Sequence, residues 1–247
     1  MPLEPTIEHP IRIVVGAGMP EKVAAIVLEH SIRTRTEAPL EFIHTYEMTR
    51  PTWKGFPPTP LNDPLNPYPR DKDPTNFSFV RLWVPELCGR SGWAIYLDSD
   101  MLVFLDIREL WSYRTQKYPV LKAAGGCTSV LLINCEAVNW DAWKAVEECR
   151  KDPRQYGHVS QRLCGQENIG TFPAGWNHRD TYIPGETRLL HYTARMAQPW
   201  AFPGKNKHEK YWFQALRETF AAGRLDISDC ERLPCWKEHG PKSTIPA

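Results

Sequence analysis

Two aspartates stand one residue apart where a long apolar segment ends: Asp98 and Asp100 follow residues 92–97, GWAIYL. An unbroken apolar run of this length is typical of a strand buried on both faces. Residues i and i+2 of an extended chain point the same way, so both carboxylates can aim at one point beyond the strand. Their repulsion and desolvation must be compensated, either by a divalent cation such as Mg²⁺, Ca²⁺ or Mn²⁺ or by strand-end capping and salt bridges.

The Asp-x-Asp pattern occurs a second time, at Asp71 and Asp73. A chain of this composition yields about one such pattern by chance, so only the surroundings separate the two occurrences. The second lies in residues 51–74, where eight prolines in twenty-four residues exclude a helix or a central strand. We expect a long irregular loop there that borders the site, with Asp71 and Asp73 exposed to solvent.

The elements that must position the first pair begin near the N-terminus. The apolar pattern predicts a strand over residues 11–15, a turn over residues 16–18, a helix and a second strand over residues 40–44. This order is typical of a parallel, doubly wound α/β sheet. The exposed amides of Gly16 and Ala17 could bind a ligand, or the segment could make only a tight turn, since the third glycine of the dinucleotide fingerprint is missing.

The rest of the chain continues as an α/β pattern. The expected elements are a helix over 77–87 bent at Pro85, an apolar run over 101–105, a helical turn over 107–111, strands over 120–124 and 130–134, a helix over 138–150, a loop over 165–177, a strand over 188–192 and a helix over 207–222. No strong pattern follows Asp226.

Length and charge narrow the classes of protein. At 247 residues the chain accommodates one large α/β domain or at most two small ones. The formal net charge of +1 gives no electrostatic footprint for nucleic acid or an anionic membrane. No run is long enough to span a bilayer and the N-terminus lacks the pattern of a signal peptide, so we expect a cytoplasmic protein without a transmembrane segment.

The cysteines agree with that location. They number seven, none forms a C-x-x-C pair and several lie in apolar runs. We expect buried free thiols in a reducing cytosol, with a Cys230–Cys235 disulfide as the alternative. The C-terminal helix with Trp212 is expected to pack on the core, with peripheral attachment to a membrane as the alternative.

Several short segments follow one another in an order that is itself informative. They are residues 77–82 (FSFVRL), 95–100 (IYLDSD), 106–111 (DIRELW), 129–134 (SVLLIN), 166–168 (QEN), 172–177 (FPAGWN) and 191–200 (HYTARMAQPW). In this order they resemble motifs of the family-8 glycosyltransferases, the group of glycogenin and the bacterial lipooligosaccharide galactosyltransferases: an ARL helix, YLDxD, DIxxLW, GVLLIN, DQDxxN, LPxxWN and HYxGxxKPW. The N-terminal strand and helix resemble a divergent bacterial branch of that family.

The resemblance implies a GT-A-like fold, a mixed and mostly parallel sheet flanked by helices, as one domain over residues 1–225 with a tail over residues 226–247. By position, Asp98 and Asp100 match the aspartates that hold Mn²⁺ against the donor diphosphate, and His191 matches the third protein ligand. An imidazole beside two carboxylates favours Mn²⁺, with Mg²⁺ as the alternative. Without the resemblance, His191 would be interpreted as a core histidine at a strand end.

The resemblance also implies donor-binding residues. Arg81 matches a basic residue near the donor phosphates and sugar, with a salt bridge from helix to surface as the alternative. Gln198 stands where the family has a phosphate-binding lysine, and Arg195 could supply the missing cation. The further positions expected to contact the donor are Gly16, Ala17, Ser99, Thr128 and Ser129.

Two residues are assigned to the chemistry by the same resemblance. Gln166 matches the glutamine near the anomeric carbon in enzymes that retain configuration, where its carbonyl dipole would stabilise an oxocarbenium-like centre. The family has an aspartate before this glutamine, but the chain has Gly165. Glu167 is the nearest substitute acid.

These inferences combine into one functional hypothesis with two alternatives. The hypothesis is a metal-dependent, retaining glycosyltransferase that moves a hexose from a nucleotide sugar, UDP-glucose or UDP-galactose, to an unknown glycan, lipid or protein acceptor. The proline-rich residues 51–74 are expected to contact that acceptor. The alternatives are a nucleotidyltransferase of similar α/β design and an inactive protein that binds sugar or nucleotide. Departures at residues 16–18 and 127–129 leave the base and the sugar open.

Overall fold

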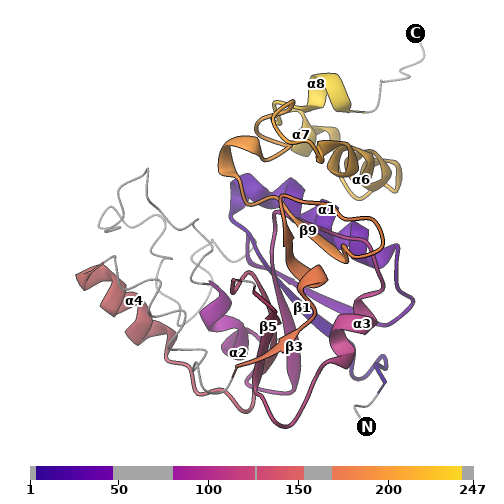
Figure 1. Ribbon diagram of the computed structural model, residues 1–247. Coiled ribbons are helices and arrows are strands. Elements are labelled where there is room, and N and C mark those ends of the chain that lie inside the picture. The colour runs from indigo at the N-terminus through magenta and orange to yellow at the C-terminus, as the bar shows by residue number, and fades with distance from the viewer. Residues whose placement is uncertain (1–3, 47–79, 126, 153–168, 241–247) are drawn as a thin grey trace. The chain divides into compact units, whose positions relative to one another are not determined.

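The computed structural model describes residues 4–46, 80–125, 127–152 and 169–240, and the chain divides into two compact units (Figure 1). The first unit consists of Met1–Pro20, Ala38–Asp98 and Arg108–Ala174. The second consists of Glu21–Glu37, Ser99–Ile107 and Gly175–Ala247. The expected division into one domain over residues 1–225 and a tail stays a prediction.

The first unit is built on a six-stranded sheet in the order β2-β1-β3-β6-β5-β7. The strands are β1 (Ile11–Gly16), β2 (Leu40–His44), β3 (Trp93–Asp98), β5 (Val120–Ala123), β6 (Val130–Asn134) and β7 (Ile169–Phe172). Strand β6 is antiparallel to both of its neighbours, and the other pairs are parallel. The sheet is therefore mixed and mostly parallel, which confirms the α/β fold class expected from the sequence.

Side-chain alternation along β3 decides what surrounds its last residue. Ala94, Tyr96 and Asp98 are two residues apart and so share one face of the sheet. On that face Ala94 and Tyr96 belong to a buried cluster with Val84 of helix α2 (Val84–Leu87). The parallel register sets Gly16 of β1 beside Asp98. Asp98 thus ends a strand whose preceding positions on the same face are apolar and buried.

The second unit is built on a three-stranded sheet in the order β4-β9-β8 and on helices α1 and α6. Its elements are η1 (Met19–Glu21, shared with the first unit), α1 (Lys22–Arg33), β4 (Met101–Val103), η5 (Ala174–Asn177, which begins at the last residue of the first unit), β8 (His178–Arg179), β9 (Leu189–His191), η6 (Arg195–Ala197), α6 (Glu209–Ala221), α7 (Ile227–Cys230) and α8 (Trp236–His239). Helix α1 contacts both β4 and α6. The core between them includes Val27, Leu190 and Trp212, so Trp212 packs inside as expected.

Local signals explain where helices α4 and α2 begin. The Asp141 side chain accepts a hydrogen bond from the Lys144 N–H at 2.9 Å and so caps helix α4 (Ala142–Lys151). The helix therefore begins at Ala142, later than the expected residue 138. The expected helix over residues 77–87 is, in its described part, a 3₁₀ turn η3 (Val80–Trp83) followed by α2. Pro85 lies at the start of α2, where its missing N–H is tolerated. A short helix α3 (Ile107–Ser112) agrees with the expected turn.

One expectation is wrong. Residues 165–177 were expected to be a loop, but their described part holds β7 and η5. Strand β7 is short and has a glycine inside it, which weakens the strand signal. The tail from Asp226, where the sequence shows no strong pattern, contains the short helices α7 and α8. The proline-rich residues 51–74, with Asp71 and Asp73, lie outside the described residues.

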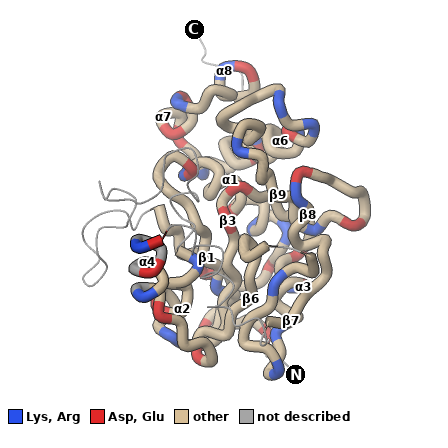
Figure 2. The backbone as a smooth tube through the Cα atoms, turned by 60° about the vertical axis from the view of Figure 1, so that its left-hand side comes forward, with Lys and Arg blue, Asp and Glu red and all other residues tan. Residues whose placement is uncertain are grey.

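Several composition-based expectations can be compared with the structure. Five cysteines are free thiols in the structure: Cys88, Cys127, Cys135, Cys230 and Cys235. The Cys230–Cys235 disulfide is therefore not formed. Among the helices that the structure describes, none has the length and apolarity needed to cross a membrane. Figure 2 shows acidic and basic residues interspersed along the described chain.

A substitution at Gly16 tests the close approach of β1 to Tyr96. An added Cβ would lie 2.9 Å from the Tyr96 Cζ atom and closer still to the hydroxyl oxygen. We expect Gly16→Ala to lower the free energy of unfolding by about 1–3 kcal/mol, as in other overpacked cores. Urea denaturation measures it. Because phenylalanine lacks the hydroxyl, Gly16→Ala should cost less stability in a Tyr96→Phe background than in wild type. Equal stability of Gly16→Ala and wild type would contradict the packing.

Candidate functional site

Asp98 is buried and has its charge compensated within the first unit. Its carboxylate accepts a hydrogen bond from the Tyr96 hydroxyl at 2.6 Å. It also accepts from Arg81 Nη2, at 3.1 Å to Oδ1 and 3.3 Å to Oδ2. Its backbone N–H donates to the Ser129 carbonyl at 3.1 Å. A strand-end salt bridge, one of the two compensations expected from the sequence, is thus present at Asp98.

Arg81 is a buried arginine of η3 that serves two partners. Besides Asp98, it donates from Nη1 to the Thr128 hydroxyl at 2.6 Å. Its guanidinium lies 5.3 Å from the centre of the Tyr96 ring. The Arg81 and Asp98 side chains are only 8% and 9% exposed, so each charge depends on the other for compensation.

Asp100 and His191 come together within the second unit. Pairing of β4 with β9 sets Met101 opposite His191, and the Tyr192 N–H donates to the Asp100 carbonyl at 2.9 Å. His191 Nε2 then lies 3.1 Å from Asp100 Oδ1. Both residues are buried. Residues almost a hundred positions apart are therefore joined by the register of one short sheet.

Asn177 selects the tautomer of the His191 ring. Its side-chain oxygen lies 2.9 Å from His191 Nδ1, so Nδ1 carries the proton and Nε2 presents a lone pair in the neutral ring. That lone pair faces Asp100 Oδ1, which is buried and accepts no hydrogen bond among the described residues. A protonated ring or a cation would relieve this contact. The arrangement fits a metal ion, because histidine ligands usually donate their other ring nitrogen to an oxygen acceptor.

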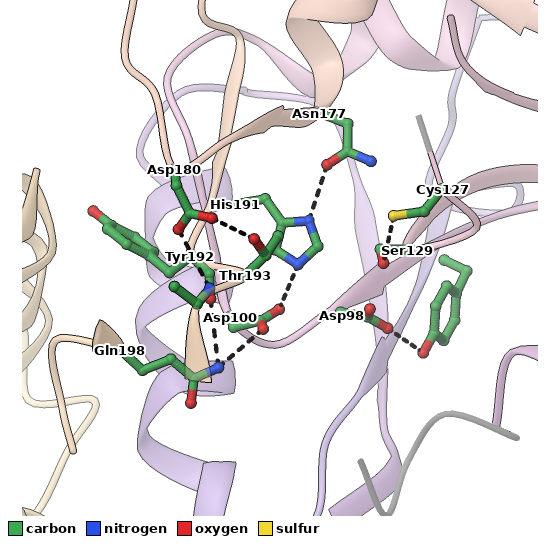
Figure 3. Close-up of polar contacts among 12 residues, drawn as sticks. Asp98, Asp100, Cys127, Ser129, Asn177, Asp180, His191, Tyr192, Thr193 and Gln198 are labelled. Carbon is green, nitrogen blue, oxygen red and sulfur yellow. Dashed lines mark hydrogen bonds and ion pairs between the residues drawn. The ribbon is translucent and has the colours of Figure 1, made fainter. Parts of the chain in front are cut away.

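Gln198 holds the other oxygen of Asp100. Its amide Nε2 donates to Asp100 Oδ2 at 3.1 Å and to the Tyr192 carbonyl at 3.4 Å. Figure 3 shows the resulting series of contacts from Asn177 through His191 and Asp100 to Gln198.

The segment after β9 is held by further contacts. The Thr193 hydroxyl and the Ala194 N–H donate to the Asp180 carboxylate. The buried Tyr192 hydroxyl donates to the His208 carbonyl at 3.1 Å. Burial raises the pKa of Tyr192, so this phenol keeps its proton and the hydrogen bond. These bonds fix the chain at Tyr192 and over the two residues that follow it.

Asp98, Asp100 and His191 form the one group of histidine, cysteine or acidic residues that could hold a metal ion within the part of the chain the structure describes. Asp98 and Asp100 are joined through Ser99 alone. The Ser99 hydroxyl is buried and has no hydrogen-bond partner among the described residues. The donor set of two carboxylates and one imidazole suits Mn²⁺ better than Mg²⁺.

The expected donor-binding residues differ from one another in burial and in hydrogen bonding. The Ala17 N–H and carbonyl are both bonded to the Thr45 hydroxyl, each at 2.9 Å. Ser129 is buried, and its hydroxyl lies 3.0 Å from Cys127 Sγ. Arg195 is exposed in η6. The expected catalytic residues, Gln166 and Glu167, lie outside the described residues.

Sequence reasoning missed two residues that support the proposed metal ligands: Asn177, which contacts His191, and Tyr96, which contacts Asp98. Asn177 lies in the FPAGWN segment, so the signal was present, but an asparagine in a motif does not reveal the histidine it contacts. Tyr96 precedes Asp98 by two residues, and the alternation of a strand could have set it on the same face.

Comparison with known proteins locates the fold. No model of a known protein family matches the chain. Protein CDI of Arabidopsis thaliana is 32% identical over 117 residues, which make up 46% of this chain and 40% of that protein. The chain therefore spans less than half of that relative's length.

Two solved glycosyltransferases share the fold at low sequence identity. Galactosyltransferase LgtC, in complex with donor and acceptor sugar analogs, has a TM-score of 0.62 at 15% identity, covering 87% of this chain and 100% of that chain. The apo form of glycosyltransferase GlyE in Streptococcus pneumoniae TIGR4 has a TM-score of 0.59 at 14% identity, covering 87% and 64%. These likenesses confirm the expected fold; membership of family 8 stays a prediction.

The buried ion pair can be tested by removing its cation. We expect Arg81→Met to lower the free energy of unfolding by about 3–5 kcal/mol, because it leaves the buried Asp98 carboxylate without its cation. Arg81→Met combined with Asp98→Asn should recover most of the loss in urea denaturation. The matched control is Arg90→Met, which breaks the more exposed pair with Glu86 (46% and 28% exposed) and should cost at most about 1 kcal/mol. Similar losses for the two arginines would contradict the role given to burial.

Proposed function

We propose that this chain is a glycosyltransferase that moves a hexose from a nucleotide sugar to an acceptor. The observation that carries the proposal is the Asp98-Ser99-Asp100 segment at the end of β3, with His191 beside Asp100, on the fold shared with LgtC and GlyE. Ligands of α/β sheets bind beyond the carboxyl ends of the strands. We take UDP-glucose or UDP-galactose as the donor, and a glycan, lipid or protein as the acceptor.

The proposed metal ligands are Asp98, Asp100 and His191, with Mn²⁺ as the ion and Mg²⁺ as the alternative. When bound, such an ion would neutralise the charge that develops on the departing nucleoside diphosphate. His191 supports this use because its proton sits on the nitrogen facing Asn177, so that Nε2 carries the lone pair that a metal ligand needs.

Charged and hydroxyl side chains would bind the donor. Arg81 donates hydrogen bonds to Asp98 and Thr128, and we propose that it also contacts the donor phosphates or sugar. Arg195, exposed in η6, would add a second cation for the phosphates. The remaining proposed contacts are Gly16, Ala17, Ser99, Thr128 and Ser129.

We further propose that transfer retains the configuration of the sugar. Gln166 would stabilise an oxocarbenium-like centre with its carbonyl dipole during attack from the front face. Gly165 has no side chain to act as a nucleophile, and Glu167 is the acidic residue nearest to Gln166 in the sequence.

Two other functions make different predictions for the same protein. A nucleotidyltransferase would catalyse pyrophosphate-dependent nucleotide exchange. An inactive binding protein would bind a nucleotide sugar without turnover, and the uncharged Gln198 near the acidic pair favours that alternative most.

The test measures metal binding and turnover separately. We expect wild type to bind Mn²⁺ in calorimetry and to release UDP slowly from UDP-glucose or UDP-galactose, with both lost in EDTA. Asp100→Asn should weaken Mn²⁺ binding at least about tenfold, because it removes a charged ligand. The matched control is Asp229→Asn, whose carboxylate pairs with Lys22 in the same unit and should leave Mn²⁺ affinity unchanged.

The outcomes separate the candidate functions. Mn²⁺ binding that is unaltered by Asp100→Asn would rule out the proposed metal group. Donor binding without turnover would favour the inactive protein, and pyrophosphate exchange would favour the nucleotidyltransferase. UDP release that persists in EDTA would keep sugar transfer but reject its dependence on metal.

A further inference from the structure

Gln198 is bonded to an acidic residue of the proposed metal group. Its amide donates to Asp100 Oδ2 at 3.1 Å, while the resemblance led us to expect a donor-phosphate contact at this position. The same amide also donates to the Tyr192 carbonyl at 3.4 Å. Both contacts lie within the second unit, and both form without a bound nucleotide sugar.

The backbone of Gln198 is held by hydrogen bonds, which fix the position from which its side chain extends to Asp100. Its carbonyl accepts hydrogen bonds from the N–H groups of Ala201 and Phe202, at 3.1 and 2.8 Å. Trp200, two residues on, is buried and packs on Trp212 of α6 with ring centres 5.4 Å apart. The turn that carries Gln198 is thus held by the core of the unit.

The contact divides the two oxygens of Asp100 between two neighbours. Oδ2 accepts from Gln198, and Oδ1 faces His191 Nε2 at 3.1 Å. An amide can orient a carboxylate in this way without neutralising it. A lysine at the same position would form an ion pair with Asp100 and would oppose the binding of a cation there.

We propose that Gln198 is a positioning residue for Asp100, which it orients toward His191, rather than a residue that binds the donor phosphates. This rests on the proposed function, because it takes Asp100 as a metal ligand. A glutamine here, in place of the lysine expected from the resemblance, leaves the full negative charge of Asp100 available to the metal. The donor phosphates then meet one fixed positive charge fewer, so nucleotide binding depends more strongly on the metal.

The sharpest test is Gln198→Glu, which keeps the size of the side chain and adds a negative charge beside Asp100. In the absence of nucleotide, we expect Mn²⁺ to bind about tenfold more tightly by calorimetry, because the added carboxylate increases the charge facing the ion. The metal-free variant should melt at a lower temperature than wild type, and Mn²⁺ should raise that temperature by more than it does in wild type.

The chain offers a matched control. Gln214 of α6 also donates its amide to a carboxylate, that of Glu218, at 2.8 Å on an exposed surface. Gln214→Glu makes the same chemical change in the same unit, next to an acid that is no proposed ligand. Its Mn²⁺ affinity should stay within twofold of wild type.

A second variant covers the case in which Gln198→Glu does not fold. Gln198→Met keeps the length of the side chain but has no amide, and it should weaken Mn²⁺ binding severalfold while leaving metal-free UDP affinity unchanged. The opposite pattern, with unchanged Mn²⁺ affinity and weaker metal-free UDP binding in either variant, would overturn the inference and return Gln198 to the donor. If wild type itself binds no Mn²⁺, the metal-dependent part of the proposed function fails, and this inference fails with it.

Discussion

The candidate site depends on two buried aspartates, one residue apart, whose carboxylates are compensated in different ways. Asp98 receives a buried guanidinium and a phenol hydroxyl, whereas Asp100 receives a neutral amide and faces an imidazole nitrogen. A full positive charge thus balances the first acid and not the second. The second is the one whose oxygen remains without a hydrogen-bond donor. This asymmetry makes Asp100, more than Asp98, the residue with capacity left for a cation.

Most of the sheet was predictable because its strands are strongly apolar and bounded by glycine or polar residues. Residues 40–44 and 130–134 form strands with the expected bounds. Strand β7 was not predictable, because Gly170 interrupts a run of only four residues. The structure explains that glycine: a Cβ there would lie 2.6 Å from Cδ2 of the Tyr118 ring. What looked like a weak strand signal is a packing requirement from another part of the chain.

The candidate site was predictable in its acids and not in its supports. Spacing along one strand was enough to select Asp98 and Asp100, and His191 followed only from a resemblance. Arg81 was expected to need a partner, but the choice of Asp98 depends on how η3 packs. The contacts of Asn177 and Thr45 could not be predicted, because an asparagine or threonine has many roles and its partner is set by the fold. Hydrogen bonds between distant segments carry no local pattern.

The anchoring of the turn after β9 has one more consequence. Trp200 is held in the core, the Tyr192 phenol is bonded to the backbone near α6, and Asp180 holds Thr193. The loss of rotational freedom around His191 and Asp100 therefore accompanies folding rather than ligand capture. A ligand that arrives at these side chains meets a preorganised surface, and little of its binding free energy is consumed in ordering the protein.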